Sequence, residues 1–170
     1  NTGLPLMIYN IPGRTGVNML PETLAKISQI RNYVAIKESA GSVEQVAAMR
    51  QLTSETFAIY SGDDSLTLPF LSVGACGVVS VASHIVGREI GQMIDDFFAG
   101  RVRSAEKLHL RLLPLFKALF VEPNPTPLKA ALELSGFPVG KPRLPLLEAT
   151  PKTKELLKTV LRDLSVLATA

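Results

Sequence analysis

The sequence predicts an α/β fold with a parallel sheet, and two observations support this prediction. Four units of a strand followed by a helix succeed one another over residues 1–100, and the strands are near-continuous apolar runs. Parallel strands that are buried on both faces and joined by helices have this pattern. No strand signal remains after residue 100. We therefore expect a sheet domain over residues 1–100 and a helical domain over residues 101–170.

Turn residues and helix-start signals give the approximate limits of each element in the first domain. Apolar and β-branched runs between turn residues predict strands over residues 4–9, 33–39, 56–61 and 76–81. Helices are predicted from Leu20, from Ser42, and over residues 65–73 and 85–98. Pro21 suits the first turn of one helix, and Ser42 with Gln45 three residues later forms a capping-box pattern at another. Residues 10–18 are predicted to be a loop.

The second domain reads as helices only. An apolar stripe with helical spacing runs through Ala105, Leu108, Leu112, Leu115 and Leu119. Pro114 is predicted to kink this helix, and the prolines of residues 122–127 end it. A second helix is predicted over residues 128–134. After a proline-rich linker, a third begins near Pro151, with a buried stripe at Leu157, Val160, Leu161, Leu164 and Leu167.

Two architectures use sequential parallel strands, and the sequence favours the barrel. A complete (β/α)8 barrel has eight units in roughly 250 residues, so four units are half of one. The alternative is a doubly wound sheet, but the glycine-rich turn that would hold a dinucleotide is missing. Polar residues cluster after three strand ends, at residues 10–15, 38–42 and 62–65. In a barrel these positions form the mouth where active sites lie.

Lys37 lies inside an otherwise apolar strand and is the first candidate for chemistry. Lysine is among the residue types least often buried. An apolar setting favours the neutral form of an amine, and a neutral lysine amine can form a Schiff base with a carbonyl substrate. The alternative is that Lys37 ends its strand, points to solvent and has no chemical role.

The composition argues against several other classes of protein. The net charge is only +3, the basic residues are spread among acidic ones, and tryptophan is absent, so we expect no nucleic-acid partner. No apolar run reaches the roughly 18 residues of a membrane span. The single cysteine, Cys76, excludes a disulfide within the chain. The two histidines, His84 and His109, lie far apart in the sequence and carry no metal-binding pattern, so no metal is expected.

Several short motifs together resemble one family. They are YNIPGRTG at residues 9–16, IKESAG at 36–41, SGDD at 61–64, GACGVVSV at 74–81, NPTPLKAAL at 124–132 and RLPL at 143–146. In this order and spacing they resemble the dihydrodipicolinate synthases, within the N-acetylneuraminate lyase family of class I aldolases. The resemblance covers nearly the whole chain. It implies barrel strands five to eight of the family, followed by its carboxyl-terminal three-helix domain.

The resemblance implies a role for five residues. Lys37 falls on the lysine that forms a Schiff base with pyruvate, and Tyr9 falls on the tyrosine that relays protons. Arg14 falls on the arginine that receives the carboxylate of the second substrate, aspartate semialdehyde, because a guanidinium can grip a carboxylate with two bonds. Gly62 and Val79 match positions that contact pyruvate or the lysine through backbone groups. No cofactor or metal is implied, because the protonated imine is the electrophile.

The resemblance also implies a homotetramer (a dimer of dimers) in the cytoplasm, or in the plastid if the source is a plant. Two alternatives remain open at this point. One is a pyruvate-dependent aldolase for a 2-keto-3-deoxy sugar acid or N-acetylneuraminate. The other is an inactive half-barrel, because the chain reads as if it begins within a domain and lacks the family's Gly-Thr-Thr-Gly-Glu type loop. Activity is expected of a full-length parent and little or none of the isolated chain.

Overall fold

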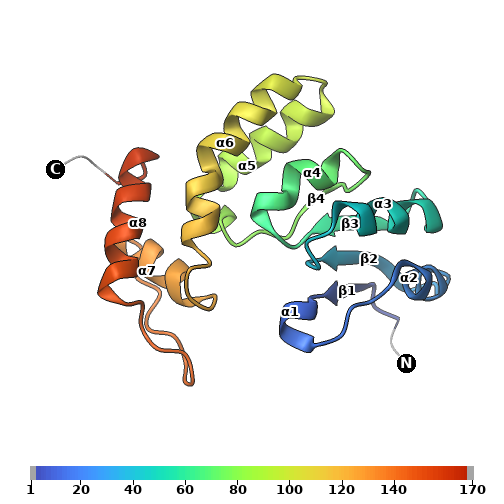
Figure 1. Ribbon diagram of the computed structural model, residues 1–170, viewed down its shortest axis with the longest axis horizontal. Coiled ribbons are helices and arrows are strands. Elements are labelled where there is room, and N and C mark those ends of the chain that lie inside the picture. The colour runs from blue at the N-terminus through green and yellow to red at the C-terminus, as the bar shows by residue number, and fades with distance from the viewer. Residues whose placement is uncertain (1–2, 168–170) are drawn as a thin grey trace. The chain divides into compact units, whose positions relative to one another are not determined.

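The computed structural model describes residues 3–167 and contains one parallel sheet (Figure 1). Its strands are β1 (Leu6–Asn10), β2 (Tyr33–Glu38), β3 (Ala58–Ser61) and β4 (Gly77–Val78). Neighbours in the sheet are also neighbours in the chain, and every pair is parallel. The predicted parallel α/β fold is therefore confirmed. A doubly wound sheet would reverse its strand order at a switch point, and this sheet does not.

Short helices connect the strands. They are α1 (Pro12–Thr15), α2 (Pro21–Ser28), α3 (Val43–Leu52), the 3-10 turn η1 (Asp64–Leu66) and α4 (Thr67–Leu71). The prediction of a plain loop over residues 10–18 is wrong, because α1 lies within it. Pro12 occupies the first turn of α1, and Gly16 ends it with φ 74° while its N–H bonds to the Pro12 carbonyl. Proline and glycine thus start and stop a helical turn here.

The sequence was less accurate at two further points. The strand predicted over residues 76–81 is paired only at Gly77–Val78. At the start of α3, Ser42 Oγ accepts a hydrogen bond from the Gln45 N–H at 3.0 Å, as the capping pattern predicts. The Gln45 side chain, however, bonds to Asn18 instead of returning to the Ser42 backbone.

One face of the sheet packs against helices and forms the core. Ile36 of β2 and Ile59 of β3 are fully buried there, beside Leu24 of α2, Met49 of α3 and Phe70 of α4. Because side chains alternate along a strand, residues of the other parity point to the opposite face. That second face carries the predicted site.

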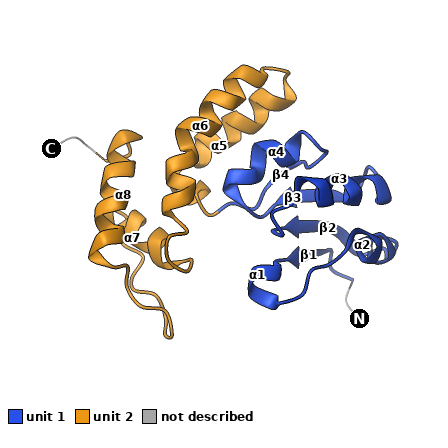
Figure 2. Cartoon of the chain, in the orientation of Figure 1, with its two compact units in different colours: residues 1–80 blue, residues 81–170 orange. Residues whose placement is uncertain are grey.

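The chain divides into two compact units, residues 1–80 and residues 81–170 (Figure 2). Over residues 81–167, the second unit has helices and no strand: α5 (Ser83–Phe98), α6 (Val102–Ala118), α7 (Thr126–Leu134) and α8 (Pro151–Asp163). The sequence placed the domain boundary after residue 100, with α5 in the barrel. In the structure α5 packs against α6, so it clusters with the helical unit. The assignment of α5 to a barrel domain stays a prediction.

Within the second unit, α8 packs against both α6 and α7, and the α6 stripe faces inward. Ala105, Leu112, Leu115 and Leu119 of that stripe are buried. The helix runs unbroken through Pro114. Buried apolar contacts on both sides of a proline can hold a helix together despite the hydrogen bond that the proline removes.

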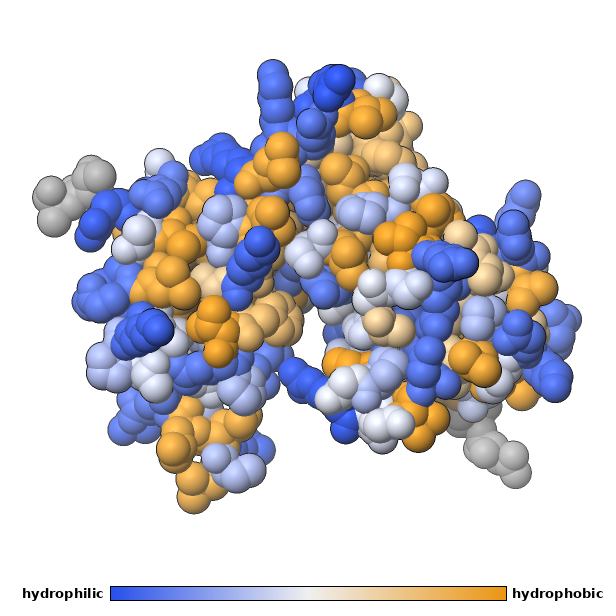
Figure 3. Space-filling view, in the orientation of Figure 1, coloured by the Kyte–Doolittle hydropathy of each residue, from blue (hydrophilic) through white to orange (hydrophobic). Residues whose placement is uncertain are grey.

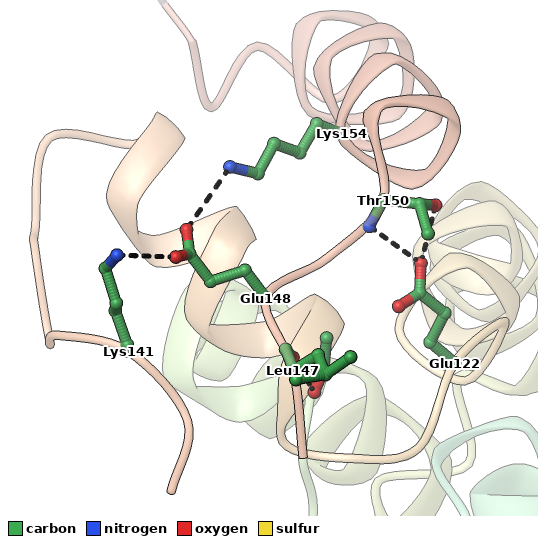
Figure 4. A network of polar contacts seen from close by, with 7 residues as sticks. Glu122, Lys141, Leu147, Glu148, Thr150 and Lys154 are labelled. Carbon is green, nitrogen blue, oxygen red and sulfur yellow. Dashed lines mark hydrogen bonds and ion pairs between the residues drawn. The ribbon is translucent and has the colours of Figure 1, made fainter. Parts of the chain in front are cut away.

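Polar contacts hold the long connection between α7 and α8 (Figure 4). Glu148 forms an ion pair with Lys141 at 2.7 Å and lies 3.9 Å from Lys154. Thr150 caps α8, and its N–H and hydroxyl both donate to Glu122. Hydrogen bonds from the two threonines Thr153 and Thr150 lower the pKa of Glu122. These contacts tie the middle of the connection to its end, and that end to Glu122 and to the first turn of α8.

The same connection carries exposed apolar side chains, visible as an orange cluster at the lower left of Figure 3. Phe137, Leu144 and Leu147 are 67%, 83% and 72% exposed. A group of exposed large apolar residues is typical of a surface that contacts another molecule. Across residues 3–167, no helix combines the length and the apolar character of a membrane-spanning segment.

Candidate active site

Tyr9 and Lys37 lie side by side on the face of the sheet opposite the core. They are register partners in the parallel pair β1–β2, so their side chains project from the same face. The Lys37 Nζ atom lies 4.2 Å from the centroid of the Tyr9 ring. Lys37, predicted to do the covalent chemistry, and Tyr9, predicted to transfer protons, are thus in direct contact. An ammonium over an aromatic face is also a cation–π contact.

The alternation of side chains explains this placement. Ile8, Ile36 and Ile59 are register partners that face the helices. Tyr9 and Lys37 each follow one of these isoleucines and must therefore point the other way. Lys37 is the penultimate residue of β2 and is partly buried, so it does not simply end its strand in solvent. Its chemical role stays a prediction.

The site face is partly open in this chain. Tyr9 is 47% exposed and Lys37 is partly buried. Within residues 3–167, no acidic side chain forms an ion pair with Lys37. No carboxylate of the described residues therefore occupies the Lys37 amine, which lies beside the Tyr9 ring on the open face.

Gly62 lies against the side chain of Lys37. A Cβ built at Gly62 would lie 2.9 Å from Lys37 Cε, 3.0 Å from Lys37 Cγ and 1.9 Å from Ser39 Oγ. Only glycine leaves room for the lysine chain at this position. The Gly62 N–H donates to the Glu38 carbonyl, and the Val79 N–H donates to the Ser61 carbonyl, both at 2.8 Å. Both predicted backbone contact points therefore have their N–H groups engaged within the sheet.

Arg14 lies in the last turn of α1, immediately after the strand that carries Tyr9. Its side chain is exposed. Within residues 3–167, it makes no ion pair with an acidic side chain. A guanidinium in this state is available to bind a carboxylate from solution.

Sequence reasoning missed the polar residues behind and beside the lysine. Glu38 is completely buried, and Asn10, its register partner, is 4% exposed. The Ser39 hydroxyl oxygen is buried and has no hydrogen-bond partner among the described residues. Tyr60 is the register partner of Lys37 on β3, and hydrogen bonding to the Cys76 thiol raises the pKa of Tyr60. The period-two pattern of the third strand could have placed Tyr60 on the site face.

The described part of the chain, residues 3–167, contains no group of three His, Cys, Asp or Glu side chains able to hold a metal ion. His109 lies against the Phe116 ring, with 6.1 Å between centroids, and burial lowers its pKa. His84 is exposed and its Nδ1 lies 3.0 Å from the Val81 carbonyl.

Comparison with known proteins agrees with the motifs. The family model described as "Dihydrodipicolinate synthetase family" matches residues 1–164. A 4-hydroxy-tetrahydrodipicolinate synthase of Cyanothece sp. is 59% identical over 163 residues, which are 96% of this chain and 55% of that protein. The corresponding protein of Desulforudis audaxviator is 54% identical over 167 residues, covering 98% of this chain and 57% of that protein.

Solved structures agree with the sequence relatives. A dihydrodipicolinate synthase of Cyanidioschyzon merolae, solved with lysine bound, matches with a TM-score of 0.94 and 51% identity over 96% of this chain and 56% of that one. The dihydrodipicolinate synthase of Thermotoga maritima matches with a TM-score of 0.95 and 42% identity, over 98% of this chain and 58% of that one. This chain therefore spans a little over half the length of its relatives, as expected for half of a (β/α)8 barrel with its helical domain. The chain belongs to the dihydrodipicolinate synthetase family.

Proposed function

We propose that this chain supplies the Schiff-base lysine of an enzyme that condenses pyruvate with aspartate semialdehyde to give 4-hydroxy-tetrahydrodipicolinate. The observation that supports this most directly is the contact between Lys37 Nζ and the Tyr9 ring, 4.2 Å from its centroid, at the carboxyl end of adjacent strands. Relatives that are 54% and 59% identical carry the name of this activity. The same relatives disfavour the sugar-acid aldolase that the sequence left open.

The proposed reaction begins when neutral Lys37 attacks the ketone carbon of pyruvate. Loss of water from the resulting carbinolamine leaves an imine, and its protonated form draws electrons from the neighbouring methyl group. A proton leaves that methyl group, and the enamine attacks the aldehyde carbon of aspartate semialdehyde. The amine of that substrate then attacks the imine carbon, which releases Lys37 and closes the ring. Dividing one difficult step into several easier ones is the advantage of covalent catalysis.

The remaining residues have roles that follow from where they lie. The Tyr9 phenol can both donate and accept a hydrogen bond, so it can move the protons of carbinolamine formation and dehydration. Exposed Arg14 can receive the carboxylate of the semialdehyde. The N–H groups of Gly62 and Val79 are engaged in the sheet, which leaves their carbonyl groups. Because pyruvate has no donor, these carbonyls can accept only from the Lys37 amine or from the carbinolamine hydroxyl.

We infer that the catalytic unit is longer than this chain. The chain spans 55–57% of the two named sequence relatives, and the face that carries Tyr9 and Lys37 is partly exposed. Experiments on activity therefore use the completed protein, meaning this chain joined to a segment corresponding to the rest of its relatives. The isolated chain is expected to give little or no turnover.

The test is chemical trapping. The completed protein is incubated with pyruvate, reduced with borohydride and digested, and peptide mass spectrometry is expected to find one reduced pyruvate on Lys37. Lys37→Arg is expected to abolish the adduct, because a guanidinium does not form the imine. Lys26→Arg, on the exposed side of α2, is the matched control and is expected to keep it. An unmodified Lys37 in the completed protein would overturn the proposal.

The proposal includes a homotetramer of the completed protein, in the cytoplasm or a plastid. Exposed Phe137, Leu144 and Leu147 support contact with another subunit. One solved relative is described as a monomeric variant, so the tetramer needs its own measurement. Sedimentation velocity of the completed protein is expected to give the mass of four subunits, and a monomer would exclude this part of the proposal.

A further inference from the structure

A buried carboxylate lies directly behind the Lys37–Tyr9 pair. Glu38 follows Lys37 in β2 and is 0% exposed. Its two oxygens accept hydrogen bonds from Asn10 Nδ2 at 3.1 and 2.8 Å, and Oε1 also accepts from the Ala40 N–H at 2.6 Å. Lys37 and Tyr9 project from one face of the sheet, so Glu38 and Asn10 project from the other. The reaction proposed above gives this carboxylate no role.

Asn10 uses the rest of its side chain to close the following loop upon itself. Its Oδ1 accepts from the Met19 N–H at 3.0 Å, and its Nδ2 donates to Asn18 Oδ1 at 2.9 Å. The loop leaves the sheet at Asn10 and returns to the side chain of the same residue. Arg14 lies within this closed loop. Asn18 is held in addition by two hydrogen bonds with Gln45 of α3.

Burial and hydrogen bonding act on Glu38 in opposite directions. Burial is the larger effect and raises the pKa of Glu38 above its ordinary value, although hydrogen bonds from Asn10, Ala40, Gln45 and Ser39 act to lower it. A buried carboxylate is costly unless donors surround it. The carboxylate here is one rigid acceptor for several donors, which include the side chains of Asn10 and Gln45 and the N–H groups of Ala40 and Ser39. An amide in its place has one acceptor oxygen and turns an NH2 group toward the NH2 group of Asn10.

We propose that Glu38 is a positioning residue that holds Arg14 at a fixed position relative to Lys37. It fixes Asn10, Asn10 closes the loop that carries Arg14, and the whole assembly is tied to the strand that carries Lys37. This inference rests on the proposed function, in which Arg14 receives the semialdehyde carboxylate. It predicts that Glu38 affects the second substrate more than the first, because Lys37 itself is fixed by its own strand.

The test compares two steps in the completed protein. Glu38→Gln is expected to raise KM for aspartate semialdehyde about tenfold, the usual effect of weakening a hydrogen bond to a buried charged group. Borohydride trapping of pyruvate on Lys37 is expected to change less than about twofold, within the range of substitutions that leave a site intact. Glu44→Gln, on the exposed face of α3, is the matched control and is expected to leave both steps unchanged.

Two further measurements separate positioning from general loss of structure. The double variant Asn10→Asp/Glu38→Gln exchanges the amide and the carboxylate, so it restores a donor and an acceptor between the two positions and keeps the bond from the Met19 N–H. It loses the donor to Asn18 Oδ1, so it is expected to recover the semialdehyde KM only in part. Hydrogen exchange of the amides of residues 13–19, which include the Met19 N–H bonded to Asn10, is expected to speed up in Glu38→Gln and to slow in part in the double variant. This measurement needs no activity. The amides of buried Ile36 and Ile59 are its internal control, because they exchange faster only if the fold as a whole is loosened.

The outcomes are distinguishable. Equal loss of pyruvate trapping and semialdehyde use in Glu38→Gln would overturn the positioning role, as would an unchanged KM or an unchanged exchange rate in the loop. Failure of the double variant to recover either quantity would also count against it. If the parent itself forms no adduct at Lys37, the proposed function fails, whereas the exchange experiment still tests the tie between Glu38 and the loop.

Discussion

Replacing Gly62 by alanine adds one methyl group where the structure leaves no room for it. The new Cβ would lie 1.9 Å from Ser39 Oγ, 2.9 Å from Lys37 Cε and 3.0 Å from Lys37 Cγ. Ser39 can relieve the first contact by rotating its hydroxyl. The Cγ atom lies close to the backbone, so Lys37 must adopt a different side-chain conformation to avoid the new methyl group. Overpacking of this kind costs about 1–3 kcal/mol.

The effect on chemistry is expected to exceed the effect on stability. Displacing a reacting atom by about 1 Å can cost on the order of 100-fold in rate. Gly62→Ala in the completed protein is therefore expected to slow borohydride-trappable adduct formation at Lys37 by about 10- to 100-fold. The assay follows the reduced adduct by mass spectrometry as a function of quench time.

Two companion variants isolate the cause. Gly62→Ala/Ser39→Ala removes the hydroxyl contact and leaves the lysine contact, so its stability and its adduct rate are both expected to stay close to those of Gly62→Ala. Gly91→Ala in α5 meets no atom within 4 Å and is the control. It is expected to raise stability by roughly 0.5–1 kcal/mol, because alanine loses less backbone entropy in a helix than glycine. An unchanged adduct rate in Gly62→Ala would refute the view that this glycine sets the path of Lys37.

Two other predictions follow from the charged and titrating residues. Arg14→Ala is expected to raise KM for aspartate semialdehyde by roughly 10- to 100-fold while pyruvate trapping persists, because a charged hydrogen-bonding group is lost. Arg31→Ala, in the exposed turn before β2, is the control. Equal loss of both steps in Arg14→Ala would contradict the assigned role. Burial lowers the pKa of His109 in the folded state, so the unfolded chain binds the proton more readily and stability falls as pH drops below the ordinary value of about 6.5. His109→Gln is expected to reduce the difference in unfolding free energy between pH 5 and pH 7.5, measured by urea unfolding. His84→Gln, at an exposed position, is the control. A pH dependence that survives in His109→Gln would assign the effect to other groups.

The sequence alone was sufficient to predict the parallel sheet and to single out Lys37 as a candidate for chemistry, and the family resemblance added Tyr9. Near-continuous apolar strands separated by helices leave few arrangements open, and a lysine among β-branched residues is rare enough to stand out. The motifs around Tyr9, Arg14 and Lys37 added the chemistry. These signals are local, because each depends on residue types within a few positions of one another.

Only the tertiary structure decided which polar groups meet. The contact of Lys37 with Tyr9 depends on the register of β1 against β2, and the sequence does not state that register. The pair Asn10–Glu38 is joined across 28 positions, and Gln45 bonds to Asn18 although its spacing from Ser42 predicts a capping box. Hydrogen bonds between segments far apart in the chain form only after packing brings them together. The polar network behind the lysine therefore left no local pattern by which to predict it.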